Sequence, residues 1–383
     1  MDLFLRLSAL LPASFDDGLA LALGAPASYA AWWARQLEEN PSRIVLETSL
    51  ILAVVLLAFM RPRGKRTEFK LTRREVDDLL HDWTPDPLVD DALLDGGSLA
   101  HTTAYTTATR PDLVLARKLG ATVVTREGAE LVDFCTFDFL GLTCDHDVKR
   151  ACVEVLDHVG CGACGPRGFY GTLDEHMELE DKIASFMGVP ESIMYSDAAS
   201  TAASVIPAFA KRSDMVFVDE ACYDAILTGV MLSRCTAVYF KHNDMADLAR
   251  KLDAVAARDK ERGTSPATQR RFVVVEGIYR NTGDIVPLKE VVELKDKHHC
   301  RLILDESFSF GVLGDTGRGV TEHFGVPMKQ VDIVCGALCA SIGSVGGFCI
   351  GNEREVVNHQ RLQGAGYVFS ASAPPFVARA ATV

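Results

Sequence analysis

Residues Val331 to Gly351 read VDIVCGALCASIGSVGGFCIG. A short apolar run comes first, then a turn of small residues, then the pair Gly346 and Gly347 and a second apolar run. The pattern predicts two buried strands that are joined by a glycine-rich loop. A loop of this kind normally presents one reactive side chain between rigid strands, but Ala340 stands at its point.

Outward from this loop, short apolar runs alternate with amphipathic segments. The predicted strands lie within residues 121–125, 129–137, 191–196, 215–220, 236–240, 271–277, 301–306 and 331–337. The predicted helices lie within residues 147–159, 174–187, 245–262 and 288–297. Such alternation predicts an α/β domain over residues 120–383, with a mostly parallel sheet flanked by helices. Ligands of these sheets bind at the carboxyl ends of the strands.

The composition limits the classes of function. Of the 383 residues, 48 % are hydrophobic and 24 % are charged, which suits a chain with a sizeable core. The formal net charge of −13 argues against nucleic acid as a partner. Cys161 and Cys164 form a C-x-x-C pair among the 11 cysteines, but no second pair completes a metal site, so we expect none. Reduced thiols packed as small apolar groups are the plainer interpretation.

The strongest signal before residue 100 is the apolar run IVLETSLILAVVLLAFM, from Ile44 to Met60. Its length and hydropathy predict a transmembrane helix over residues 43–60. Arginines and lysines crowd residues 61–74, which predicts that everything downstream is cytosolic. A buried core helix is the alternative.

The segments on either side of this run are less regular. Residues 1–42 mix apolar pieces with Trp32 and Trp33, which indicates an interfacial segment, and a flexible N-terminus is equally open. Residues 61–119 form a basic juxtamembrane segment and linker, in which an amphipathic helix is expected from Glu75 to Trp83.

Polar side chains follow several of the predicted strands. Asp305 ends one of them, where a buried acid needs a positive or hydrogen-bonding partner, although a helix cap or a surface acid remains open. Arg167 is surrounded by glycines in GPRGFYGT, a loop able to wrap an anion or a backbone. Ser370 and Ser372 lie in FSASAPP, where hydroxyls suit a phosphate and a plain turn before proline is equally open.

The order of these segments is more specific than any one of them. The chain carries in succession GPRGFYGT (165–172), VVVEGIYRNTGDIVPL (273–288), LILDESFSFGVLGDTGRG (302–319), ASIGSVGGF (340–348) and FSASAPP (369–375). This succession resembles the α-oxoamine synthase family, fold-type-I enzymes that depend on pyridoxal phosphate (PLP). The resemblance implies the large domain of that fold, preceded here by the transmembrane helix. The helix, Thr84 to Val89 and Asp133 to Leu142 further resemble one branch, the long-chain-base-1 subunits of serine palmitoyltransferase.

The resemblance also exposes departures from the catalytic pattern. The family places the lysine that binds PLP as a Schiff base where this chain has Ala340. It places histidines where this chain has Phe308 and Tyr223, and usually glycine, near the phosphate, where Ala198 stands. The acidic partner of the pyridine nitrogen is kept as Asp305 and is vestigial. The resemblance therefore implies that this chain has no catalytic residue of its own.

In this family the active sites lie at a dimer interface, so the resemblance implies a lysine-bearing partner that holds the PLP, the long-chain-base-2 subunit. Ser370 and Ser372 match a turn that reaches the phosphate of the partner's cofactor. Cys164, Arg167 and Tyr170 match positions near the substrate or the interface, and simple packing is the alternative for Cys164.

The resemblance implies a complex at the endoplasmic reticulum membrane, in which this chain is single-pass with a cytosolic large domain. The complex condenses L-serine with palmitoyl-CoA to 3-ketodihydrosphingosine, the first step of sphingolipid biosynthesis. A small activating subunit and an Orm-type regulator are further expected partners. The alternatives are a self-sufficient PLP enzyme, which needs the lysine that Ala340 replaces, and a regulatory or scaffold pseudoenzyme without a part in any active site. The family continues into a small C-terminal domain, so we expect the chain, which stops at Val383, to be truncated before it.

Overall fold

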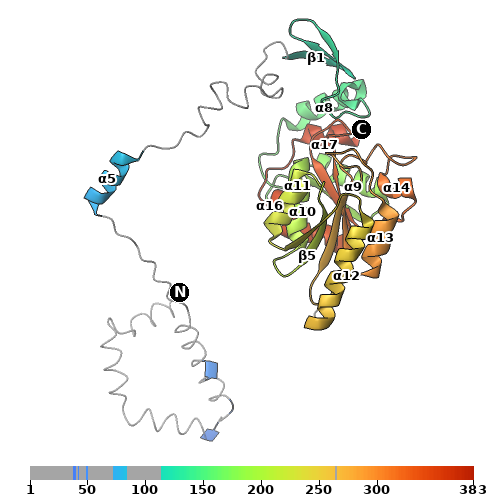
Figure 1. Ribbon diagram of the computed structural model, residues 1–383. Helices are drawn as coiled ribbons and strands as arrows, with labels where there is room; N and C mark the ends of the chain where they lie inside the picture. The colour runs from blue at the N-terminus through green and yellow to red at the C-terminus, as the bar shows by residue number, and fades with distance from the viewer. Residues whose placement is uncertain (1–37, 40–41, 43–48, 51–71, 84–113, 264) are drawn as a thin grey trace. The chain divides into compact units, whose positions relative to one another are not determined.

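The computed structural model describes residues 38–39, 42, 49–50, 72–83, 114–263 and 265–383 (Figure 1). The chain divides into two units, Met1–Asp90 and Asp91–Val383. Most of the predicted interfacial segment and of the predicted transmembrane helix lies outside the described residues. Within the described ranges, no helix has the length and hydropathy of a membrane span.

Helix α5 (Arg73–Asp82) belongs to the first unit. The Thr72 hydroxyl accepts a hydrogen bond from the Glu75 backbone N–H at 3.4 Å, and the Glu75 carboxylate accepts one from the Thr72 N–H at 2.7 Å. This reciprocal capping box satisfies the free N–H groups of the first turn. The helix expected from Glu75 is therefore confirmed, with an earlier start that the cap at Thr72 explains.

A seven-stranded sheet forms the centre of the second unit, in the order β4-β10-β9-β8-β7-β5-β6. Its strands are β4 (Glu191–Tyr195), β5 (Met215–Asp219), β6 (Thr236–Phe240), β7 (Arg271–Glu276), β8 (Arg301–Asp305), β9 (Ile333–Ala337) and β10 (Gly347–Gly351). All pairs from β6 to β9 are parallel, whereas β10 is antiparallel to both β9 and β4. The prediction of a mostly parallel sheet is thus confirmed, with β9 and β10 as an antiparallel hairpin within it.

Helices cover both faces of this sheet, and Figure 1 shows α10 and α11 on one side and α12 and α13 on the other. Four helices agree with the predicted ones: α8 (His146–Val159), α9 (Asp174–Met187), α12 (Met245–Arg262) and α13 (Leu288–Lys297). Helices α10 (Ala198–Phe209) and α11 (Asp224–Ser233) are absent from the prediction. Both consist largely of small and apolar residues, so they lack the polar stripe that reveals a surface helix.

Shorter elements complete the second unit. They are η2 (Leu142–Cys144), α14 (Val320–Phe324), η3 (Met328–Gln330), α15 (Arg354–Gln363), α16 (Ala365–Val368) and α17 (Pro375–Thr382). A separate antiparallel sheet contains β1 (Leu115–Leu119), β2 (Thr122–Thr125) and β3 (Glu130–Val132). Val123 and Thr125 of β2 are buried, and they anchor this small sheet on the domain.

The register of the parallel strands brings their carboxyl ends to one edge. All residues of β5 and β7 are buried, which explains why they read as continuous apolar runs. Asp219, Glu276 and Asp305 end β5, β7 and β8, and Glu276 lies directly beside Asp305 in the ladder. The fold thus gathers acids from distant parts of the sequence where ligands of such sheets bind.

Candidate functional site

The loop between β9 and β10 is a tight turn that holds Ala340 in the interior. Ala340 is 1 % exposed, and its carbonyl accepts a hydrogen bond from the Phe139 N–H at 3.1 Å. The Ser341 hydroxyl donates to the Phe310 carbonyl at 2.6 Å, which ties the loop to the segment after β8. Gly343 and Gly346 have φ angles of 70° and 121°, which side chains rarely tolerate. The loop is well fixed, yet the group it presents is a methyl.

Asp305 lies at the same edge with one oxygen unmatched. Its Oδ1 accepts a hydrogen bond from the Ser307 N–H at 2.9 Å, whereas its buried Oδ2 has no hydrogen-bond partner in the described part of the chain. Burial raises the pKa of Asp305 to about 6, and the Ser307 hydrogen bonds and the nearby Tyr223 phenol offset part of that rise. An unmatched buried carboxylate oxygen suits a positive or N–H-bearing group from outside the chain.

Two further carboxyls at this edge are bound by backbone N–H groups and a hydroxyl. Glu276 accepts from the N–H groups of Tyr223 at 2.7 Å and Arg280 at 3.0 Å, and Glu306 accepts from the Val320 N–H at 2.9 Å and from the Ser309 hydroxyl. Burial, with the charge of Asp305, raises the pKa of Glu276 to about 8. Burial likewise raises the pKa of Glu306 to about 7. Both carboxyls are therefore largely or partly protonated near pH 7, and in the described part of the chain their hydrogen bonds come from backbone N–H groups and a hydroxyl.

Asp219 differs from these acids because it has a basic partner. Its Oδ1 lies 2.9 Å from His242 Nδ1, and its Oδ2 accepts a hydrogen bond from the Tyr279 hydroxyl at 3.0 Å. The other ring nitrogen of His242 lies 3.1 Å from Asp284. Hydrogen bonds to both carboxylates outweigh the effect of burial and raise the pKa of His242. This arrangement joins the ends of β5 and β6 to the turn after β7.

An aromatic cluster surrounds Phe308, the residue that stands where the family resemblance expects a histidine. The rings of Phe308 and Phe137 lie 4.7 Å apart and those of Phe308 and Phe139 lie 6.5 Å apart, edge to face in both cases. The guanidinium of Arg280 lies 6.0 Å from the Phe137 ring and 5.8 Å from the Tyr223 ring. The cluster replaces proton-transferring imidazoles with rings that offer only stacking and a nearby cation.

The N-terminus of α10 carries an acid of its own. Asp197 caps the helix, and its carboxylate accepts a hydrogen bond from the Ser200 N–H at 2.7 Å. A free helix N-terminus attracts anions because its N–H groups are unpaired and its dipole is positive. Here a fixed carboxylate already satisfies part of that demand, and its charge opposes a phosphate. This is the helix that begins at Ala198, which the resemblance places near the cofactor phosphate.

The GPRGFYGT loop is held from within by Arg167. Its guanidinium makes two parallel hydrogen bonds to Glu180, at 2.9 and 3.0 Å, and its side chain is 5 % exposed. The Tyr367 ring lies 5.7 Å from Arg167 and 5.8 Å from Arg361, and Arg361 Nη2 approaches Glu180 at 3.5 Å. Arg167 therefore points into the domain and binds the loop to α9, so it is not free to meet a ligand.

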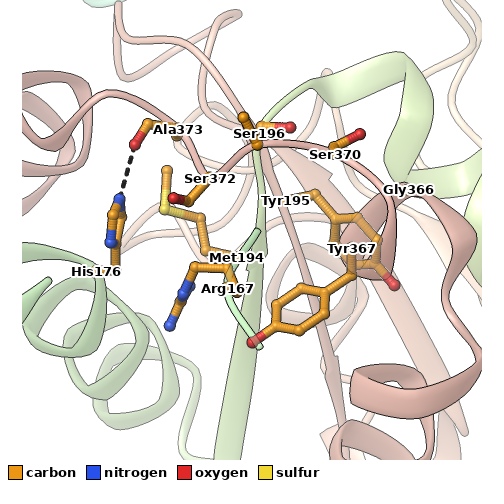
Figure 2. A pocket seen from close by; sticks show the side chains of 11 residues that line it. Arg167, His176, Met194, Tyr195, Ser196, Gly366, Tyr367, Ser370, Ser372 and Ala373 are labelled. Carbon is orange, nitrogen blue, oxygen red and sulfur yellow. Dashed lines mark hydrogen bonds between the residues drawn. The ribbon is translucent and has the colours of Figure 1, made fainter. Parts of the chain in front are cut away.

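The turn that contains Ser370 and Ser372 lies against the same loop. The Ser372 backbone N–H and hydroxyl both donate to the Gly165 carbonyl at 2.9 Å, so this serine joins the two segments. Ser370 is partly buried and, with Ser196 and Ser372, lines a small pocket opposite Arg167 and Tyr367 (Figure 2). The cavity is about 10 Å³, room for about one water molecule. The hydroxyl of Ser372 is thus used inside the chain.

The other predicted residues of this region point outward. Tyr170 is fully exposed with a φ of 66°, and Cys164 is exposed with a φ of 54°. Phe169 and Phe369 are 63 % and 84 % exposed, on the two segments that Ser372 joins. Large apolar side chains at this exposure, on well-held loops, are typical of a surface that a partner covers.

Several residues of the site were not predicted from the sequence. Glu180 lies within a helix, where an acid draws no attention, and only its contact with Arg167 reveals its role. Arg280 and Phe137 belong to segments whose order indicates the family. Their contact was not predicted, because the two residues lie far apart in the sequence. Asp197 could have been predicted from the sequence, because an aspartate directly before an apolar helical stretch is a typical N-cap residue.

Comparisons with known proteins agree with this architecture. The family model of aminotransferases of class I and II matches residues 129–382. The structure also resembles a serine palmitoyltransferase from S. paucimobilis with a bound PLP–myriocin aldimine, with a TM-score of 0.67 and 32 % identity over 77 % of this chain and 74 % of that one. A serine palmitoyltransferase of Sphingomonas wittichii gives the same TM-score of 0.67, over 76 % of this chain and 71 % of that one. The chain therefore belongs to the class of PLP-dependent proteins with the fold-type-I large domain.

The curated relatives narrow this class. The chain is 44 % identical over 332 residues to long chain base biosynthesis protein 1c of Oryza sativa subsp. japonica, covering 87 % of this chain and 65 % of the relative. It is 40 % identical over 360 residues to long chain base biosynthesis protein 1 of Arabidopsis thaliana, covering 91 % and 71 %. Serine palmitoyltransferase 1 of Saccharomyces cerevisiae is 35 % identical over 88 % of this chain and 61 % of its own length. The chain belongs to this family of long-chain-base-1 proteins, and it spans 65 % of the length of the first of these relatives.

Proposed function

We propose that this chain is the non-catalytic, membrane-anchoring subunit of a serine palmitoyltransferase. Its complex condenses L-serine with palmitoyl-CoA to 3-ketodihydrosphingosine at the endoplasmic reticulum membrane, with this chain's large domain in the cytosol. A lysine-bearing long-chain-base-2 subunit holds the PLP, which supplies the electron sink for the reaction. A small activating subunit and an Orm-type regulator complete the proposed assembly. The observation that carries the proposal is Ala340, a methyl at the point of an otherwise intact loop.

The residues of this chain do not fit PLP as a cofactor of its own. Ala340 has no amine to form an imine, and the Asp197 carboxylate occupies the helix start where a phosphate needs free N–H groups. Phe308 and Tyr223 offer no imidazole to move a proton. The unmatched Oδ2 of Asp305 is the one feature that suits the cofactor ring. We therefore derive no chemical step within this chain.

What this chain contributes is an ordered face for the partner. The Arg167–Glu180 pair and the Ser372 hydrogen bond hold the GPRGFYGT loop against the Ser370 turn. This fixes the positions of Tyr170 and Cys164, whose side chains face outward. In the proposed complex, Ser370 lies toward the phosphate of the partner's cofactor, and Cys164 and Tyr170 border the substrate. Pre-positioned groups of this kind lose little entropy on binding.

The first test is co-purification. The tagged full chain is expressed with its lysine-bearing paralogue, isolated from membranes in detergent, and assayed for condensation of L-serine with palmitoyl-CoA. We expect the paralogue in the purified complex and activity only when both chains are present. Full activity of the paralogue alone would favour the scaffold interpretation.

A second test concerns Ala340 directly. Ala340→Lys should yield no imine that borohydride fixes to this chain, because Asp197 and Phe308 remain. Ala340→Met is the matched control for the added bulk at this buried position. A borohydride-fixed adduct in Ala340→Lys, absent from Ala340→Met, would show that the loop alone decides cofactor binding.

A third test separates a part in the active site from a mere scaffold. Ser370→Ala in the two-chain complex should weaken retention of PLP by the partner, measured as cofactor lost on dialysis. Ser185→Ala, an exposed serine on α9, is the control for a hydroxyl outside the turn. Identical retention in both variants would leave the Ser370 turn without a role at the cofactor.

A further inference from the structure

A cavity with a basic lining lies at the amino edge of the sheet, away from the site described above. Its volume is about 560 Å³, and its polar lining consists of Ser265, Arg270, Arg271, His299 and Arg301. Arg271 and Arg301 begin β7 and β8, whose other ends carry Glu276 and Asp305. Strands of this length span roughly 17–20 Å, so the cavity is separate from the carboxyl edge.

Each arginine of the lining is held by an aspartate that does not itself line the cavity. Arg270 lies 2.8 Å from Asp214, and Arg301 lies 3.3 Å from Asp332. These contacts use one Nη of each guanidinium, which has five N–H donors in total. Asp332 also accepts from the Leu302 N–H at 2.8 Å and approaches Lys295 at 3.5 Å, so its charge is shared. The pairs orient the guanidinium groups and leave donors for a further acceptor.

Arg271 carries the strongest sign that an acceptor is missing. Its side chain is 4 % exposed, and one Nη lies 2.6 Å from Asp259 in an ion pair. Its Nε has no hydrogen-bond acceptor in the described part of the chain. A buried guanidinium N–H without an acceptor is costly, and anionic oxygens are the acceptors that guanidinium binds best.

We propose that this cavity binds a phosphate group carried by a larger polar molecule. Guanidinium forks match phosphate oxygens in pairs, and none of the described residues that line the cavity is itself acidic. The volume exceeds what an inorganic phosphate fills and lies in the range of small-molecule sites. A basic cavity is also unexpected from a chain with a formal net charge of −13. The phosphate group can belong to a soluble phosphate ester or to a lipid headgroup.

Thermal unfolding of the full chain in a zwitterionic detergent tests the phosphate chemistry. Inorganic phosphate, glycerol 3-phosphate and inositol 1-phosphate are compared with sodium chloride at equal ionic strength, and unfolding is followed by circular dichroism. A bound phosphate ester at ten times its Kd should raise Tm by roughly 2–4 °C. A rise that sodium chloride reproduces would overturn the proposal.

Variants locate the effect. Arg301→Gln removes a side chain that is 63 % exposed, so we expect the variant to fold and its Kd for glycerol 3-phosphate to rise at least threefold. Arg354→Gln, which is 69 % exposed and lies 3.7 Å from Glu191, is the matched control and should keep the wild-type Kd. An equal response in both variants would overturn the assignment to this cavity. Arg271→Gln is not used alone, because it removes a buried guanidinium that lies 2.6 Å from Asp259 and can affect folding.

Vesicle flotation separates the two sources of phosphate. Vesicles of phosphatidylcholine are compared with vesicles that also contain phosphatidylinositol 4-phosphate. Binding that the phosphoinositide strengthens and Arg301→Gln removes assigns a lipid headgroup. Equal binding to both vesicles, with the glycerol 3-phosphate response retained, assigns a soluble ester.

Discussion

The two edges of the central sheet differ in how their buried acids are paired, although Asp219 at the carboxyl edge has His242 beside it. At the amino edge, Asp214 lies 2.8 Å from Arg270, and its oxygens also accept backbone N–H groups. At the carboxyl edge, and among the residues that the structure describes, Asp305 has an oxygen without a hydrogen-bond partner and Glu276 accepts from the backbone N–H groups of Tyr223 and Arg280. Burial raises the pKa of Asp305 and, together with the charge of Asp305, that of Glu276, and their hydrogen bonds offset only part of the rise.

This difference shows at which edge buried acids lack a cationic partner in the described part of the chain. Ion pairs between neighbouring strand ends have a structural role, because both charges belong to this chain and neutralise each other without a ligand or a partner protein. A buried carboxyl with a raised pKa destabilises the fold when it ionises. Such groups are therefore expected where a positive group from outside the chain pairs with them, or where function requires them. Among the described residues, Asp305 and Glu276 of the carboxyl edge therefore lack a positive partner. This supports the proposal that another chain completes the active site at this edge.

The largest expected effect is the pH dependence of stability. Asp305, Glu306 and Glu276 have folded-state pKa values of about 6, 7 and 8, above their unfolded values of about 4. Between these limits the folded chain binds more protons, so its free energy of unfolding falls as pH rises. We expect a loss of several kcal/mol from pH 5 to pH 8.5.

Urea denaturation followed by circular dichroism measures this loss. Tryptophan fluorescence is unsuitable, because Trp32, Trp33 and Trp83 all lie in the first unit of the chain. A flat profile would mean that cations from elsewhere reach the carboxyl edge and that the contrast between the edges is false.

The next effect belongs to the amino edge. Arg271→Met should destabilise the domain by about 3 kcal/mol, because it removes the buried guanidinium that lies 2.6 Å from the Asp259 carboxylate. Arg301→Met is the control, and it should cost less than about 1 kcal/mol because its side chain is 63 % exposed. Equal losses in urea titrations of the two variants would mean that burial does not distinguish these pairs.

A smaller effect, of opposite sign, is expected at the carboxyl edge. Asp305→Asn keeps the acceptor for the Ser307 N–H and removes the buried charge. We expect a gain of about 2 kcal/mol at pH 8 and about half of that at pH 5, where the carboxyl is mostly protonated in the folded chain but ionised in the unfolded one. Asp332→Asn, which weakens the pairs with Arg301 and Lys295, should instead destabilise. If Asp305→Asn also destabilises at pH 8, then the carboxylate has a cationic partner after all.

The smallest effect concerns the cap of α10. Asp197→Asn should change the free energy of unfolding by less than about 0.5 kcal/mol, since asparagine caps helices as well as aspartate does. Thermal and urea unfolding of the variant at pH 7 measure the change. A loss above about 1 kcal/mol would point to a cation that binds the Asp197 carboxylate.

Much of the fold follows from local pattern. The buried strands β5, β7 and β9 are short apolar runs between turn residues, and their length of five or six residues favours a strand over a buried helix. Helices α10 and α11 were missed because α10 is largely buried and because α11 exposes the apolar Met231 and Leu232, so neither helix has a polar face. An amphipathic period is visible only when one face of a helix is apolar and the other is polar, and a helix that is apolar on both faces shows none.

The site divides in the same way. The positions of Ala340, Phe308 and Tyr223 came from the order of motifs along the chain. That Arg167 turns inward to Glu180 while Tyr170 faces outward is invisible in the string GPRGFYGT, because a loop has no fixed period. The contact between Arg280 and Phe137 joins segments that only the folded sheet brings together.

By itself the sequence determined the class of fold, the membership of the family and the missing amine at Ala340, since residue identity and local spacing carry that information. Only the tertiary structure decided which charges are paired, because pairing depends on distances between strands that lie far apart in the chain. It showed that Asp305 and Glu276 meet without a cation, whereas Asp214 meets Arg270. It also placed Arg271 and Arg301 around one cavity, since parallel strands bring their first residues to a common edge.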